Sequence, residues 1–139
     1  MTALTLVVLI ASGCGGELAE SRDAPGTSAQ ICTEFTATND RYLANETPEA
    51  KAYSDALKAA YTGDRVAYAD LPRLRRLHFE GWHREIMLLA EQAEGDGVRQ
   101  AIEAYADSLQ RQAAQEGSGE GPNGLVDDKA AVDKACGKG

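Results

Sequence analysis

The feature that most constrains the fold is a long segment in which apolar residues return every three or four positions. It covers residues 70–95, DLPRLRRLHFEGWHREIMLLAEQAEG. The recurring positions are Leu71, Leu74, Leu77, His78, Trp82, Ile86, Leu89 and Ala93. This spacing follows one face of an α-helix, so the segment predicts an amphipathic helix with one buried side. Asp70 can cap this helix, because a proline such as Pro72 is best tolerated in the first turn. Alternatively, residues 64–69 join the helix, which then has a kink at Pro72.

Three further segments share this period. Residues 31–43 place Cys32, Phe35, Asn39 and Tyr42 on one face, and residues 98–113 repeat Val98, Ile102, Tyr105 and Leu109. Between them, Thr47 and Pro48 form a typical helix start, and the helix they open extends to the turn at Gly63. A short last helix follows residue 124. No segment alternates as a strand does, so the sequence predicts an all-α fold, an antiparallel up-down bundle of four to five helices.

The chain opens on an uncharged apolar run, MTALTLVVLIASG, followed by Cys14. The run is too short to span a bilayer and has the length of a signal-peptide core. Its end, Ala11-Ser12-Gly13-Cys14, resembles the lipobox of bacterial lipoproteins, where a diacylglyceryl group is attached to the cysteine before cleavage makes it the N-terminus. The resemblance implies that residues 1–13 are a lipoprotein signal peptide and that Cys14 is lipidated. An ordinary secretory signal and a buried N-terminal helix or strand are the alternatives.

The region after Cys14 supports an anchor. Residues 14–30 form a tether of small and charged residues interrupted by Pro25-Gly26. About 16 flexible residues give a typical reach of ~20–25 Å. The predicted bundle domain covers residues 31–137 and contains a flexible loop at 117–124, GSGEGPNG.

Three cysteines leave one unpaired in an exported protein. If Cys14 carries lipid, Cys32 and Cys136 remain, one near each end of the predicted domain. Export permits a disulfide between them, and lipidation explains the odd thiol. The alternative is two separate buried thiols.

The layout as a whole resembles the small helical lipoproteins of high-GC Gram-positive bacteria. The features that carry the resemblance are the lipobox, the tether, and one cysteine near each end of the domain. It implies a location at the extracytoplasmic face of the cell membrane, reached through the N-terminal lipid, together with a helical fold. It assigns no activity.

Composition and motifs narrow the function. The net charge of −8 disfavours nucleic acid as a partner, because phosphate binding needs clustered Lys and Arg. Glu80 and His83 have the spacing of a bundle metal motif, but the only other histidine, His78, points elsewhere on the same helix, so a solvent-facing polar pair is expected and no metal or other cofactor. Asp127-Asp128 are expected at a helix start, where they suit the dipole. No catalytic set is visible, and an enzyme is not expected.

Two groups of residues are candidates for binding. Arg73 and Arg76 share a helix face within PRLRRLH, a run that can dock an anionic partner or form a solvated surface. Trp82, with Phe79 and Tyr68, can line a groove or belong to the core. The leading hypothesis is a non-enzymatic, membrane-tethered bundle that binds a protein or envelope partner through Arg73, Arg76 and Trp82. The alternatives are a carrier of a small apolar ligand and a phage-encoded lipoprotein that excludes superinfecting phage.

Overall fold

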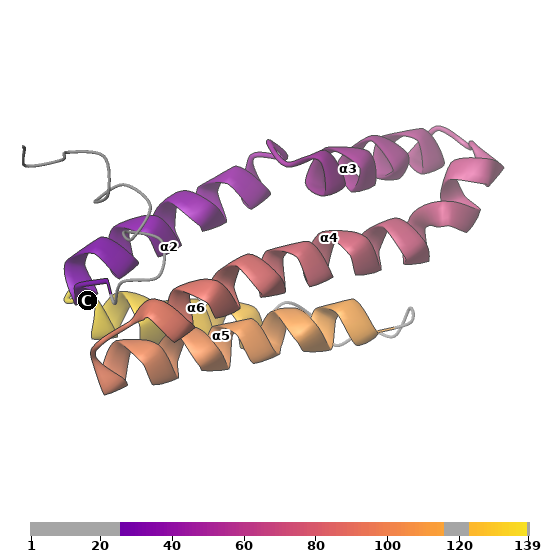
Figure 1. Cartoon of the computed structure of the whole chain (residues 1–139). Helices are drawn as coiled ribbons and strands as arrows, with labels where there is room; N and C mark the ends of the chain where they lie inside the picture. The colour runs from indigo at the N-terminus through magenta and orange to yellow at the C-terminus, as the bar shows by residue number, and fades with distance from the viewer. Residues whose placement is uncertain (1–25, 116–122, 139) are drawn as a thin grey trace, which may run out of the picture.

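Five α-helices, and no strand, make up the residues that the computed structural model describes, 26–115 and 123–138 (Figure 1). The helices are α2 (Ser28–Leu43), α3 (Pro48–Tyr61), α4 (Arg65–Gln92), α5 (Asp96–Ala114) and α6 (Asn123–Ala135). The all-α prediction is confirmed. The predicted signal peptide, most of the tether and most of the loop at 117–124 lie outside the described residues.

The helices form an antiparallel arrangement in which α4 is central. Helices α2 and α3 follow one another in the same direction, and α4 returns along both (Figure 1). Helix α5 then packs along α4, and α6 packs on α5. The chain between α2 and α3 turns at Asn45, whose φ of 58° lies in the left-handed region that asparagine tolerates better than most residues. Thr47 then caps α3 by accepting a hydrogen bond from the N–H of Ala50, as the sequence predicted.

The N-cap of helix α4 lies six residues before Asp70, at the earlier of the two starts that the sequence left open. The carboxylate of Asp64 accepts hydrogen bonds from the N–H groups of Val66 (2.9 Å) and Ala67 (3.0 Å), so Asp64 is the N-cap. The first turns therefore join the helix, which continues through Pro72. The side chain of Asp70 instead pairs with Arg73 one turn later.

The core runs along the centre of the bundle. Its largest fully buried side chains are Tyr105, Phe35, Ile31, Ile86, Ile102, Leu109, Val132 and Asn39. The rings of Phe35 and Tyr105 meet edge to face with centroids 5.1 Å apart. Cys32 in α2 and Cys136, just after α6, form a disulfide with Cα atoms 5.9 Å apart. The predicted pairing is confirmed, and it makes α2 and α6 neighbours.

The two ends of the bundle differ, and we call them the base and the tip. The base holds the disulfide and the first described residue, Gly26, whose N–H donates to the carbonyl of Gln92 at the end of α4 (2.8 Å). The tip is the turn between α3 and α4, where Gly63 adopts a φ of 96°. Because α4 has 28 residues, the tip lies about 40 Å from the base (Figure 1).

Candidate functional site

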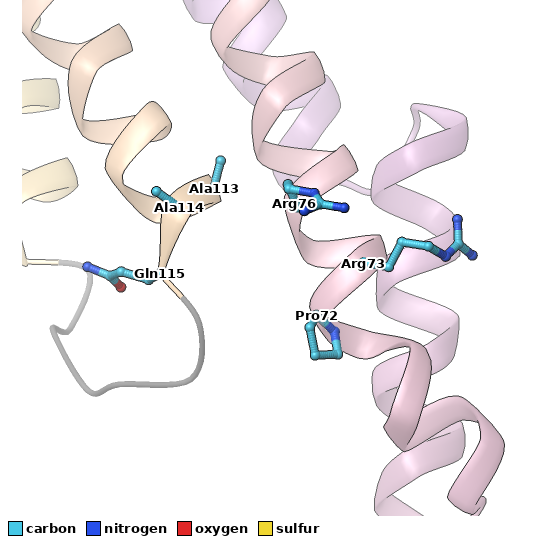
Figure 2. Close-up of a pocket in the computed structure, with 6 residues that line it drawn as sticks. All are labelled: Pro72, Arg73, Arg76, Ala113, Ala114 and Gln115. Carbon is cyan, nitrogen blue, oxygen red and sulfur yellow. The ribbon is translucent and has the colours of Figure 1, made fainter.

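A cleft between α4 and α5 brings together the two arginines predicted to share a face. It has a volume of about 200 Å³ and is lined by Pro72, Arg73, Arg76, Ala113, Ala114 and Gln115 (Figure 2). Arg73 makes two hydrogen bonds of 2.7 Å to Asp70, which lower the pKa of that carboxyl. No side-chain partner of Arg76 is found among the described residues. Arg76 is therefore available to an external anion.

Arg75 faces a different direction from Arg73 and Arg76. Its guanidinium donates to the backbone carbonyl of Gln115 and to the side chain of Gln112, and it lies over the ring of Phe79 at 5.6 Å. These contacts hold the carboxyl end of α5 against α4, where its last carbonyls have no helical partners.

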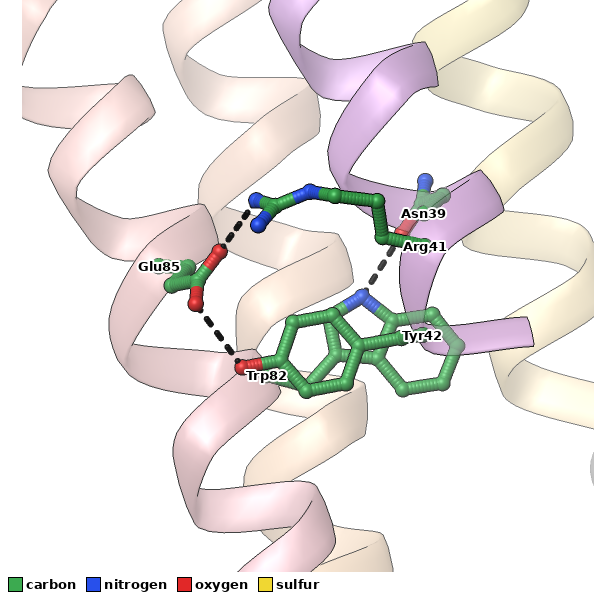
Figure 3. A network of polar contacts seen from close by, with 5 residues as sticks. All are labelled: Asn39, Arg41, Tyr42, Trp82 and Glu85. Atoms are coloured by element: carbon green, nitrogen blue, oxygen red, sulfur yellow. Dashed lines mark hydrogen bonds and ion pairs between the residues drawn. The ribbon is translucent and has the colours of Figure 1, made fainter. Parts of the chain in front are cut away.

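Trp82 lies in the core, away from the arginine cleft. Its side chain is 3% exposed and stacks on Tyr42 with ring centroids 5.2 Å apart. Its indole N–H donates to the side-chain oxygen of Asn39 at 2.7 Å (Figure 3). The candidate set of Arg73, Arg76 and Trp82 is thus not one surface. Of the two interpretations that the sequence left open for Trp82, a groove residue or a core residue, the second is confirmed.

A polar network joins α2 to α4 beside Trp82. Glu85 accepts a hydrogen bond from the hydroxyl of Tyr42 (3.1 Å) and pairs with Arg41 (2.7 Å) (Figure 3). Burial and the neighbouring Glu85 carboxylate raise the pKa of Tyr42, so its hydroxyl stays protonated and donates. The network fixes the contact between α2 and α4. Its partners are 43 and 44 residues apart, which helix periodicity cannot foresee.

His78 lies in an aromatic cluster on the α3 side of α4. Its ring stacks on Tyr53 and contacts Tyr42, Phe79 and Trp82, with centroids between 4.8 and 5.8 Å. Burial lowers the pKa of His78, and Glu49 partly opposes that shift. His78 therefore belongs to the core and not to the arginine surface.

His83 and Glu80 do not form the solvent-facing pair that the sequence predicted. The ring Nδ1 of His83 lies 2.8 Å from the carbonyl oxygen of Ala106 in α5. The ring is directed at α5 because α5 packs against this side of α4. Among the described residues, no three His, Cys, Asp or Glu side chains are grouped to hold a metal ion.

Asp127 and Asp128 do not begin the last helix, because α6 starts at Asn123. Asp128 instead accepts a hydrogen bond from the hydroxyl of Ser108 and lies 3.7 Å from the guanidinium of Arg111. Ser108 is buried in α5. This group of polar side chains attaches α6 to α5.

The large apolar side chains with the highest exposed fractions among the described residues lie at the tip. Tyr61, Val66 and Tyr68 are 89%, 80% and 71% exposed. A groove of about 220 Å³ lies between α3 and α4 and is lined by Leu57, Ala60, Tyr61, Tyr68 and Leu71. Of the three aromatic residues proposed for a groove, only Tyr68 lines it. Sequence reasoning did not name Tyr61, the last residue of α3, as a candidate.

No described helix combines the length and the apolar character that a membrane crossing requires. Cys14, the predicted lipidation site, lies outside the described residues. No protein family, curated protein or solved structure matches this chain.

Proposed function

We propose that this chain is a lipid-anchored lipoprotein on the extracytoplasmic face of the cell membrane. Its bundle binds a protein of the cell envelope and carries out no catalysis. The anchor rests on the uncharged apolar run that ends in Ala-Ser-Gly-Cys14. The disulfide between Cys32 and Cys136 supports it, because such bridges persist in oxidising compartments outside the cytoplasm.

The observation that carries the binding role is an exposed apolar surface on a bundle whose central aromatic side chains, Trp82 and Tyr105, are buried against one another. We define the tip surface as Leu57, Ala60, Tyr61, Arg65, Tyr68, Leu71, Pro72 and Arg76. Two of its tyrosines are more than two-thirds exposed. Contiguous exposed apolar side chains on a soluble domain are typical of interaction sites.

The interior supports a partner-binding module over a carrier of a small ligand. Trp82 and Tyr105, which would line a central ligand pocket, are buried against one another with ring centroids 6.2 Å apart. The tip groove, at about 220 Å³, is smaller than the 300–1,000 Å³ typical of small-molecule sites. It suits side chains of a protein partner.

The geometry of the bundle supports the same role. The tether joins the bundle at the base, beside the carbonyl of Gln92, and the tip surface lies about 40 Å away. A lipid at Cys14 would thus leave the tip surface accessible from outside the membrane.

The anchor is tested by fractionating cells that make the chain and by intact-mass analysis. We expect the wild type in the membrane fraction, beginning at Cys14 with added diacylglyceryl mass, and Cys14→Ala released from the membrane. A Cys14→Ala chain that stays membrane-bound, or a mature chain that begins elsewhere, would refute the anchor.

The binding role is tested with a photo-crosslinking residue placed in the same cells at Tyr61 or, as a control, at Val126. Both side chains are exposed, and only Tyr61 belongs to the tip surface. We expect a discrete cross-linked envelope protein from position 61 and none from position 126. Equal products from both positions, or none from either, would contradict the proposal.

A further inference from the structure

One side of α4 is covered along part of its length only. Arg65, Tyr68, Pro72 and Arg76 follow one another at three- and four-residue steps, so they form a stripe along the helix. The same steps continue through Phe79, His83, Ile86 and Ala90.

The continuation of this stripe meets α5. His83 contacts the carbonyl of Ala106, and Ile86 and Ala90 are fully buried. Helix α5 ends at Ala114, where Arg75 binds the carbonyl of Gln115. Within the described residues, the stripe from Arg65 to Arg76 is therefore exposed at and beyond the end of α5, next to the tip groove.

The charge available at this place is positive. Residues 48–76 contain six basic residues (Lys and Arg) and four acidic residues (Asp and Glu), whereas the whole chain contains 14 basic and 22 acidic residues. Asp55 and Asp70 are paired with basic residues of the same helix, and Asp64 caps α4. Arg65 and Arg76 have no side-chain partner among the described residues. They lie 11 residues apart, about 16 Å along α4.

We infer that the tip surface binds an amphipathic helix with an acidic polar face, supplied by another protein. This inference rests on the proposed function and names the chemistry of its partner. The helix lies on α4 in line with α5 and inserts apolar side chains between Tyr61 and Tyr68. Its carboxylates reach Arg65 and Arg76. A helix in a groove between two helices is a common mode of recognition, with anchors at three- and four-residue steps.

Two other occupants fit less well. The apolar run of this chain is joined to Gly26 by residues 12–25, and a linker of that length would typically span ~20 Å if it were unstructured, half the distance to the tip. A second copy that paired tip to tip about a two-fold axis would set Arg65 and Arg76 against the same unpaired arginines. Like charges at such an interface oppose association.

The test uses the full chain as purified from cells, held in neutral-lipid nanodiscs if it carries lipid. The probe is a fluorescent peptide of about 18 residues, five helical turns, with leucine at every third or fourth position and glutamate on its polar face. The control peptide carries lysine at each glutamate. We expect saturable binding of the glutamate peptide, at least tenfold tighter than the lysine peptide, and weaker binding as salt rises from about 0.05 M to about 0.5 M.

The location is tested with matched charge reversals. Arg65→Glu combined with Arg76→Glu should weaken binding of the glutamate peptide about tenfold. Arg84→Glu combined with Lys134→Glu makes the same change in net charge at two exposed residues outside the tip, and should change binding less than twofold. Glutamate at the first residue of α4 suits the helix dipole, so a loss of fold is not expected from the tip variant. Hydrogen exchange should show protection by the peptide within residues 57–76.

Several outcomes would overturn the inference. They are no saturable binding of the glutamate peptide, equal binding of both peptides, equal loss in the two double variants, or protection elsewhere. Sedimentation of the chain alone as a dimer that is dissociated by the tip variant would assign the surface to a second copy instead. A position-61 cross-link in cells combined with no peptide binding would reject the acidic helix and leave the proposed function standing.

Discussion

Loss of the Cys32–Cys136 disulfide should lower stability substantially. The bridge closes a loop with a sequence separation of 104 residues. In the chain-entropy model a loop of that length stabilises the folded state by about 4.7 kcal/mol, because it restricts the unfolded chain. For about 110 folded residues, an unfolding entropy of about 2.1 cal/mol/K per residue converts this into a fall in Tm of about 20 °C.

The structure also predicts where the loss is felt first. Helix α6 has 13 residues, and among residues 124–135 only Val132 is fully buried. A helix this short is marginal without tertiary contacts. Without the bridge, α6 keeps its packing on α5 and the Ser108–Asp128 hydrogen bond. Because few contacts remain to hold this short helix, residues 125–138 should exchange amide hydrogens faster, while α4 and α5 change little.

The assay compares Cys32→Ala/Cys136→Ala with the oxidised wild type by thermal unfolding and by hydrogen exchange. Reduced wild type is the control, since it removes the bridge and keeps both side chains. If Tm decreased by less than about 5 °C in both the double alanine variant and the reduced wild type, the entropic argument would fail here. Loss of protection in α5 before α6 would refute the assignment of α6 as the dependent helix.

Three further predictions concern side chains that join one helix to another. Asn39→Ala leaves the buried N–H of Trp82 without its acceptor and should cost about 1–3 kcal/mol, measured as a shift of the urea midpoint. Burial lowers the pKa of His78 in the folded state, so on acidification the unfolded chain takes up a proton before the folded chain does. The stability that depends on His78 should be fully present above about pH 6.5 and should fall below that pH. His78→Gln should flatten this pH dependence in thermal melts measured over a series of pH values. An unchanged slope in that variant would exclude His78 as the source. Arg75→Ala removes the hydrogen bond to the carbonyl of Gln115 and should destabilise the chain by about 1–2 kcal/mol, with faster exchange confined to the end of α5; a uniform increase along α5 would contradict this role.

Much of the helical architecture follows from local signals in the sequence. Thr47 and Pro48 start α3 as predicted, because a capping hydroxyl and a preset φ act within one turn. For α4 the sequence left two starts open, and the structure has the earlier one, in which residues 64–69 join the helix. Asp64 and Asp70 are both possible caps, and the choice depends on which carboxylate meets free N–H groups.

The candidate site was less predictable. The shared face of Arg73 and Arg76 is a local property of one helix, and both line one cleft. Trp82 shares its helix with them, but its burial depends on Tyr42 and Asn39 in α2. The exposure of Tyr61 depends on an absent neighbour, since no other helix covers the end of α3 within the described residues. An apolar period alone does not reveal such an absence.

The sequence by itself determined the helices, their apolar faces and the cysteine pair, because these depend on contacts three or four residues apart and on a count of thiols. The tertiary structure decided which of those faces are covered. Helix α5 has 19 residues against 28 in α4, and it packs against the part of α4 nearer the base, from about Arg75 onward. The stripe that is core at Ile86 therefore becomes surface at Tyr68, although both positions have the same period. Burial is set by the length and position of neighbouring helices, which no local pattern contains.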